Sequence, residues 1–206
     1  MPQAMPSAAA PVATHTDTRS RAVEATLACL ARYGLSKTTI DDIAREAGCA
    51  RATLYRHIGG KRALVLLTIG AEAERITTEL HAVAAEHDTL EDAAVAVVTT
   101  AARELTTHPA IQFVLGFEPE LALPHVTFEG GDRFLAHART ALAPCFDRFL
   151  PADEAARAAE WVTRVTLAYA YKPDAPVDVT DEAAVRRLVR QFIVPAFLPT
   201  TNTIRG

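Results

Sequence analysis

Long hydrophobic runs are missing from this chain of 206 residues. A membrane-spanning helix needs about 18 or more apolar residues without charges, and no such stretch is present, so we expect no transmembrane segment. Residues 1–16 also lack the basic start and the long apolar core of a signal peptide. Their Ala/Pro-rich composition instead predicts a disordered tail, and we expect the protein to be cytoplasmic.

Cysteine is scarce as well. Cys29, Cys49 and Cys145 lie far apart and are odd in number, which favours a reducing compartment over a disulfide framework. Neither a CxxC pair nor a Cys/His spacing typical of zinc sites occurs, and the HExxH, GxSxG, P-loop and GxGxxG motifs are absent. We therefore expect no metal or nucleotide cofactor, and we expect that the chain is not an enzyme.

Excess positive charge is found at only one end of the chain. Residues 17–65 hold nine basic and five acidic residues, a net charge of +4, which leaves −8 for the remainder. A basic region on an acidic protein can meet a polyanion at one end only. Charge segregation also arises by accident, so the asymmetry points to nucleic acid only when a binding motif accompanies it.

Apolar residues recur at helical spacing along most of the chain, and no alternating run is long enough for a strand. Near the N-terminus the spacing predicts a helix over residues 17–33, which Gly34 ends. A second helix begins after Thr39, with Asp42 as its capping-box partner. A third, short helix covers residues 51–57.

The remaining sequence predicts further helices and therefore an all-α fold. A long fourth helix from Lys61 to about Glu86 would join an N-terminal three-helix head (residues 17–63) to a helical C-terminal body (residues 64–206). Within the body, residues 118–131 are expected to be irregular. The other helices are expected at 88–105 with Asp88 and Glu91 at its start, from Pro109 to Pro119, at 132–150 with an interruption near Pro144, at 153–171 capped by Asp153, and from Thr180 or Asp181 to near Pro195.

Two short helices joined by a glycine turn, the second basic and polar, form the pattern of a helix-turn-helix. In that motif the second helix enters the major groove of DNA. Its first residues, Arg51, Ala52 and Thr53, would then reach base edges, because arginine can bind guanine through two hydrogen bonds and small side chains can touch the thymine methyl group. The polar side chains that suit phosphate groups are Thr39, Tyr55, His57 and Lys61. An ordinary helical hairpin with scattered polar residues is the alternative.

A resemblance to a known family favours the DNA-binding interpretation. The run RAVEATLACLARYGLSKTTIDDIAREAGCARATLYRHIGGKRAL (residues 21–64) resembles the DNA-binding head of TetR-family transcriptional regulators (TetR/AcrR type). The family pattern is matched in order by Tyr33-Gly34, Thr38-Thr39-Ile40, Asp42-Ile43-Ala44, Ala47-Gly48, Thr53-Leu54-Tyr55, His57, and Lys61 with Leu64. The departures are Ala50 in place of a Ser/Thr-type cap, Ile58 in place of Phe, and Gly60-Lys61-Arg62 in place of Ser-Lys-Glu.

The resemblance implies a homodimer that binds a palindromic operator on double-stranded DNA. It places phosphate contacts at Thr39, Tyr55, His57 and Lys61 and base contacts at Arg51, Ala52 and Thr53. It also implies that the body binds a small molecule in an apolar pocket and pairs its two C-terminal helices with those of a second copy.

Side chains in the body can be suggested for both roles, although each could equally be part of an ordinary core. Aromatic residues with a few polar neighbours would line the pocket, and the broad apolar faces of the last two helices would form a four-helix interface. The pocket candidates are Phe113, Phe117, Phe128, Phe134, His137, Trp161 and Thr166. The interface candidates are Val165, Tyr169, Leu188 and Phe192.

The function that we predict from the sequence is a ligand-responsive repressor, released from its operator by a small apolar effector. An activator or dual regulator on the same scaffold remains an alternative. An all-α enzyme with an apolar pocket would need a nucleophile or an acid–base pair, and the sequence displays neither. A helical adaptor without a role on DNA would leave the basic head unexplained.

Overall fold

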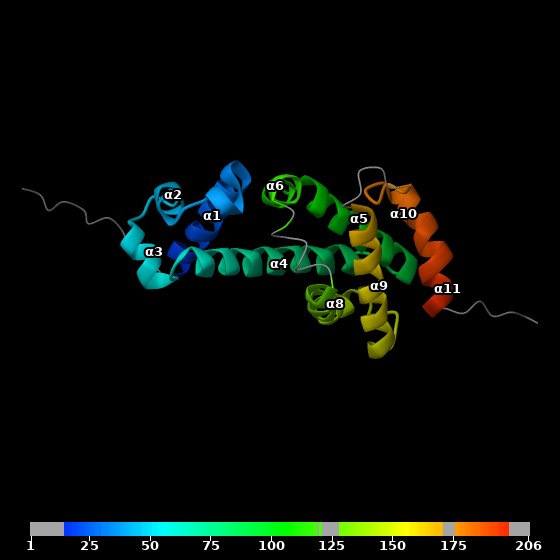
Figure 1. The fold of residues 1–206 in the computed structure, drawn as a ribbon. Helices are drawn as coiled ribbons and strands as arrows, with labels where there is room; N and C mark the ends of the chain where they lie inside the picture. Colours follow the sequence, from blue (N-terminus) through cyan, green and yellow to red (C-terminus); the bar gives the residue numbers. More distant parts are fainter. Residues whose placement is uncertain (1–14, 119, 121–127, 171–175, 198–206) are drawn as a thin grey trace, which may run out of the picture.

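Every regular element is helical in the part of the chain that the computed structural model describes, which is all but residues 1–14, 119, 121–127, 171–175 and 198–206. The predicted all-α class is therefore confirmed, and none of the described helices is long and apolar enough to cross a membrane. In chain order (Figure 1) the elements are α1 (His15–Lys37), α2 (Ile40–Glu46), α3 (Arg51–His57), α4 (Lys61–Ala85), α5 (Leu90–Thr107), α6 (Pro109–Phe117), α8 (Phe128–Leu142), a 3-10 turn (Ala143–Cys145), α9 (Ala152–Ala170), α10 (Glu182–Leu188), a π turn (Val189–Ile193) and α11 (Val194–Phe197).

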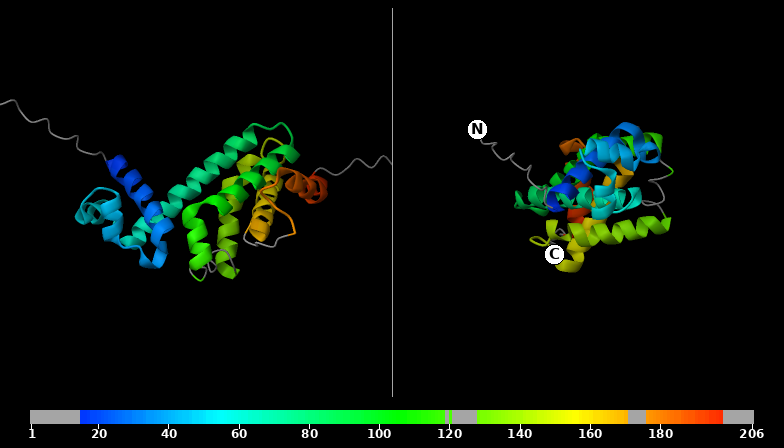
Figure 2. Two further views of the ribbon diagram at one scale, coloured as in Figure 1. Left: turned by 90° about the horizontal axis from the view of Figure 1, so that it is seen from above. Right: turned by 90° about the vertical axis from the view of Figure 1, so that its left-hand side faces the viewer.

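Helices α1, α2 and α3 form the head at one end of the molecule, and α4 extends from it into the body (Figures 1 and 2). The head has its own small core, to which the first turn of α4 contributes Leu64. Ile43, Leu54 and Leu64 are fully buried there. The other members of this head core are Ala22, Ala25, Cys29, Ile40, Ala44 and Ala47.

The body encloses a second, larger core, with α5 at its centre. Helix α5 packs against α4, α9 and α10 and buries eight of its residues. Phe146, just after the 3-10 turn, has the largest fully buried side chain in this cluster. The body core also contains Leu80, Val95, Val97, Val98, Val162, Val185, Val189 and Ile193.

In the head, α2 and α3 lie where expected, but α1 begins at His15, inside the predicted tail, and continues to Lys37 beyond its interruption at Gly34. In the body, several predicted helix ends are wrong. Asp88 was predicted to begin α5, but Thr89 is the N-cap, since its Oγ1 accepts the N–H of Asp92 at 3.1 Å. Helix α9 begins at Ala152, which places Asp153 in its first turn instead of at its cap. Helix α8 begins at Phe128, earlier than the predicted residue 132.

Pro195 was predicted to end the last helix, but it lies inside α11. A proline in a regular α-helix would press its ring against the carbonyl four residues earlier. The π turn Val189–Ile193 directly precedes α11, and its wider spacing gives the chain a way to continue through the proline. The predicted start of this final segment is confirmed, because the Asp181 carboxylate accepts the N–H groups of Ala183 and Ala184.

Replacement of the residue that caps α5 should change the stability of the protein measurably. Thr89→Ala removes the hydroxyl that accepts the Asp92 N–H, so we expect the free energy of unfolding to fall by about 1 kcal/mol. Asp88→Ala is the matched control, because Asp88 is almost fully exposed and only pairs with Arg148; its effect should stay within about 0.5 kcal/mol. Denaturant unfolding of both variants checks this, and an equal loss in the two would contradict the assignment of the cap.

Candidate DNA-binding surface

The second helix of the head begins with the capping box that the sequence predicted. Thr39 Oγ1 accepts the N–H of Asp42 at 3.2 Å, and Asp42 Oδ2 accepts the N–H of Thr39 at 3.1 Å. The Thr39 hydroxyl also donates to the same carboxylate at 2.5 Å. Hydrogen bonds from the Thr39 side chain and backbone, together with Arg45, hold the pKa of Asp42 below its ordinary value. Thr39 is exposed, so its hydroxyl lies at the protein surface while it caps the helix.

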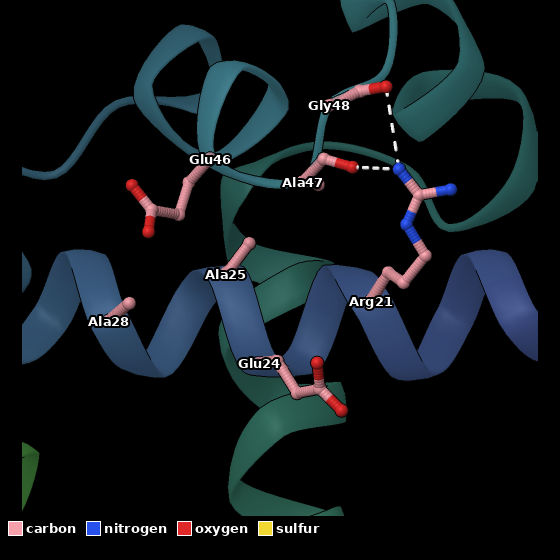
Figure 3. A pocket seen from close by; sticks show the side chains of 7 residues that line it. All are labelled: Arg21, Glu24, Ala25, Ala28, Glu46, Ala47 and Gly48. Atoms are coloured by element: carbon pink, nitrogen blue, oxygen red, sulfur yellow. Dashed lines mark hydrogen bonds between the residues drawn. The ribbon is translucent and has the colours of Figure 1, made fainter.

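The turn between α2 and α3 is fixed by Gly48 and by an arginine from α1. Gly48 has a φ of 61°, a conformation that glycine adopts at little cost. The Arg21 guanidinium donates to the backbone carbonyls of Ala47, the C-cap of α2, and of Gly48 in the turn (Figure 3). A Cβ at position 48 would lie 3.2 Å from Arg21 Nη2. Arg21 therefore joins α1 to the turn between the two helices.

Arg21 is a functional residue that sequence reasoning missed. It lies on the exposed face of a helix 26 residues before Ala47, and no local pattern connects the two. It also borders an open hollow of about 430 Å³ between α1 and the turn (Figure 3), which is lined by Arg21, Glu24, Ala25, Ala28, Glu46, Ala47 and Gly48.

Helix α3 is held in the head by one side chain and is otherwise turned outward. Leu54 is its only buried residue. Arg51 and Ala52 are exposed and Thr53 is half-buried, so the three predicted base-reading residues begin a largely solvent-facing helix. The N-cap is Ala50, which has no side-chain hydrogen bond to give, as its departure from the family pattern indicated.

Arg51 has one partner on α2 and another one turn further along α3. Its Nη1 donates to Asp41 Oδ2 at 3.0 Å and Oδ1 at 3.2 Å, and its Cζ lies 5.4 Å from the ring centroid of Tyr55. A hydrogen bond to Tyr55 and the negative charge of Asp41 raise the pKa of Arg51 above its ordinary value. The guanidinium is thus a fixed positive charge at the start of α3.

Lys61 is placed differently from what its predicted phosphate role would suggest. Its Nζ donates to the carbonyl oxygens of Leu35 at 2.5 Å and Ser36 at 3.3 Å. The ammonium therefore joins the first residue of α4 to the end of α1. Tyr55 is exposed and His57 is half-buried on α3, close to the same end of α4.

The same two residues, Leu35 and Ser36, also bind the body through their N–H groups. Glu118, which directly follows α6, accepts the N–H of Leu35 on Oε2 at 2.5 Å and the N–H of Ser36 on Oε1 at 2.9 Å. Burial disfavours this carboxylate, but the hydrogen bonds from Ser36 and Leu35 and the charge of Lys61 outweigh it, so the pKa of Glu118 lies below its ordinary value. No local pattern in the sequence indicates this contact, which spans more than 80 residues.

The approach of α6 depends on Gly34. Its φ of 79° and ψ of 176° interrupt α1 in a conformation that is almost restricted to glycine. A Cβ there would lie 2.4 Å from Phe113 Cε1 and 2.9 Å from Glu118 Oε2. The predicted stop at Gly34 is confirmed, and it also lets α6 pack directly on α1.

Comparison with known proteins agrees with this geometry. Residues 22–67 match the family model for bacterial regulatory proteins of the tetR family. Residues 22–67 thus form a tetR-type DNA-binding head. The chain is a DNA-binding transcriptional regulator and not an enzyme, in agreement with its similar proteins.

Similar proteins cover most of this chain, beyond its tetR-type head. An uncharacterized HTH-type transcriptional regulator of Mycobacterium tuberculosis is 27% identical over 169 residues, which are 81% of this chain and 78% of that protein. The TetR family repressor AlkX from Dietzia sp. strain DQ12-45-1b has a TM-score of 0.63 at 23% identity, over 84% of this chain and 94% of AlkX. A TetR-family regulator from Pectobacterium atrosepticum has a TM-score of 0.64 at 15% identity, over 89% and 96% of the two chains. The structural matches concern the fold.

The predicted pocket residues are spread over three helices of the body. On α6, Phe113 packs on Phe117 with ring centroids 4.9 Å apart, and Phe117 is 76% exposed. Phe134 and His137 are exposed on α8, and the side chain of Phe128 lies outside the described part of the chain. On α9, Trp161 is half-buried against the body core, and Thr166 is buried and donates to the Val162 carbonyl at 2.8 Å.

The predicted interface residues lie on α9, α10 and the π turn, at the end of the body away from the head (Figure 1). Val165 is half-buried, and Tyr169 and Leu188 pack in part against the body core. Phe192 is 49% exposed. A large aromatic side chain thus faces solvent at this end.

Substitution of Gly34 tests whether the contact between α1 and α6 depends on it. Gly34→Ala forces a side chain into a positive φ and against Phe113, so we expect a loss of about 1–3 kcal/mol in the free energy of unfolding. Gly70→Ala is the control, because a Cβ at Gly70 meets nothing within 4 Å and alanine favours the interior of α4. That variant should gain about 0.5–1 kcal/mol. Thermal or denaturant unfolding measures both changes, and a change in the free energy of unfolding with the same sign in both variants would contradict the explanation.

Proposed function

We propose that this regulator is a homodimeric TetR-family repressor that binds a palindromic operator through α3 and leaves it when a small apolar effector enters the body. The observation that carries the proposal is the outward face of α3, where the Arg51 guanidinium lies exposed beside Tyr55 on a helix-turn-helix. A cation at this point of the motif can reach a base edge in the major groove.

The contacts proposed with DNA divide into two classes. Arg51, Ala52 and Thr53 would contact bases, which their position in the first turn of α3 supports. The phosphate contacts would come from Thr39, Tyr55, His57 and Lys61. Since two carbonyls engage the Lys61 ammonium, it would offer a phosphate its third proton while it keeps α1 and α4 together.

Single substitutions should separate these two roles. Arg51→Ala is expected to lose about 1–3 kcal/mol of discrimination at one base pair of the operator half-site. Lys61→Ala is expected to weaken binding to all duplexes alike and to reduce the salt slope by about one. Gel-shift titrations at several salt concentrations check both, with duplexes from the promoter region beside the gene. If the Lys61→Ala protein has unchanged affinity and salt slope, Lys61 does not contact phosphates. Circular dichroism shows whether the variant is still folded.

A dimer through α9, α10 and the π turn is supported by the apolar side chains that these elements leave partly uncovered. A self-complementary pairing of two such faces makes a four-helix interface, the usual geometry of a two-fold dimer. It would cover Val165, Tyr169, Leu188 and Phe192. A dimer also suits a palindromic operator, because each head would occupy one half-site.

Light scattering of substituted proteins tests this interface. Phe192→Glu would bury a charge at the centre of the proposed contact, so we expect at least a tenfold weaker dimer. Leu66→Glu is a suitable control, since Leu66 is 59% exposed on α4 and lies outside the proposed interface. It should leave the dimer intact. Wild-type protein that stays monomeric at micromolar concentration would overturn the proposal.

Control by an effector would act through the contact between α6 and α1. The Glu118 carboxylate holds the peptide units that follow Gly34, so a displacement of α6 in the body reaches the head directly. A molecule that binds better when α6 is in one position would shift the equilibrium between two states of the dimer, which differ in the distance between the two DNA-binding heads. Only one of these spacings would fit successive major grooves.

A further inference from the structure

We propose that Asp41 is a specificity-determining residue of the DNA-binding surface, whose carboxylate positions the Arg51 guanidinium for a base and withholds it from phosphates. The inference rests on the proposed function, since it assumes that α3 meets DNA. Asp41 does not itself have to contact a base; it acts through Arg51.

The geometry joins the two helices of the motif at their DNA-facing ends. Asp41 lies in the first turn of α2, and Arg51 is the first residue of α3. Both carboxylate oxygens accept hydrogen bonds from the single nitrogen Nη1, at 3.0 and 3.2 Å. Both side chains are 54% exposed, so the pair lies at the surface that the operator would cover.

Tyr55 fixes the guanidinium from a second side. It follows Arg51 by one helical turn, and Arg51 Cζ lies 5.4 Å from its ring centroid, within the range of a cation–π interaction. Nη2 lies 3.5 Å from the Tyr55 hydroxyl. An arginine has five N–H donors in a rigid fork, and Asp41 engages only those on Nη1. Donors therefore remain for the two acceptors on the major-groove edge of guanine.

The strengths of the competing contacts decide what Asp41 does. An exposed ion pair is worth about a 1.5- to fivefold change in an equilibrium. A good two-bond contact between arginine and guanine is worth about five- to 150-fold. Guanine can therefore bind the guanidinium even though Asp41 also binds it. A single phosphate contact is closer in strength to the exposed ion pair, so the Asp41 carboxylate competes with it effectively.

The other acidic residues of α2 have different partners. Asp42 closes the capping box with Thr39 and pairs with Arg45 at 3.1 Å. Glu46, at the opposite end of the helix, pairs with Arg32 of α1 at 3.3 Å. Among the acidic residues of α2, Asp41 is thus the one that the structure joins to a proposed base-reading side chain.

Selection from a pool of random duplexes tests the inference. The wild type, Asp41→Asn, Arg51→Ala and the double variant each select duplexes, and sequencing gives the base preference at every position. Glu46→Gln is the matched control, because it removes one exposed carboxylate from the same helix without touching Arg51. Thermal unfolding shows whether each variant keeps the wild-type fold.

We expect Asp41→Asn to lose at least threefold of the guanine preference at the base pair that Arg51→Ala identifies. We also expect it to bind unselected duplexes about two- to fivefold more tightly. Glu46→Gln should leave the base preference unchanged, and the double variant should match Arg51→Ala at that base pair. Asp41→Glu, which restores a carboxylate, should recover part of the preference.

Two failures can be told apart. If Arg51→Ala loses a base preference and Asp41→Asn keeps it, the role of Asp41 is wrong and the proposed function stands. If the wild type selects no sequence, or Arg51→Ala alters no preference, the proposed function of α3 fails and the inference fails with it. If Asp41→Asn and Glu46→Gln gain equal affinity for unselected duplexes and keep the wild-type base preference, Asp41 acts only as a general surface charge. That result would also overturn the inference.

Discussion

Two residues after Gly34, Leu35 and Ser36, bind side chains through both their N–H and their carbonyl groups, and the arrangement of the molecule depends on them. Glu118 accepts their N–H groups, and Lys61 donates to their carbonyl oxygens. Such groups at an interrupted helix would otherwise need water as a partner. Because the carboxylate comes from the end of α6 and the ammonium from the start of α4, the interruption of α1 joins three helices. The opposite charges of Glu118 and Lys61 further stabilise this arrangement.

This contact gives the DNA-binding surface a defined position on the body. Lys61 lies four residues after His57, the last residue of α3, so the contact that holds α1 also restrains the end of α3. At the start of α3, Arg21 binds the carbonyls of the turn that joins it to α2. Helix α3 itself adds only Leu54 to the core. The orientation of α3 is therefore determined mainly by residues outside it.

The sequence predicted those parts of the fold whose causes are local. The capping box of Thr39 and Asp42, the positive φ of Gly34 and the burial of Leu54 all follow from residues within a few positions of one another. Thr89 was missed because Asp88 offers an equally good local cap, and only the geometry of the first turn decides between them.

Contacts between distant segments could not be predicted in this way. Neither Glu118 nor Arg21 shows a pattern, because each binds backbone groups that any residue would provide. Lys61 illustrates the same limit, since a lysine at that position fits a phosphate contact equally well. The predicted pocket residues are spread over α6, α8 and α9 because aromatic content alone does not indicate which helix face is turned inward.

Leu64 has a consequence for how the molecule unfolds. It fills the head core from the first turn of α4, while Leu80 and Ala84 of the same helix fill the body core. The loss of either core therefore exposes apolar surface on a helix that the other core needs. Helix formation is itself cooperative, so melting of one end of α4 weakens the remainder. The two cores are thermodynamically linked, and a perturbation that destabilises the body also lowers the population of correctly folded heads.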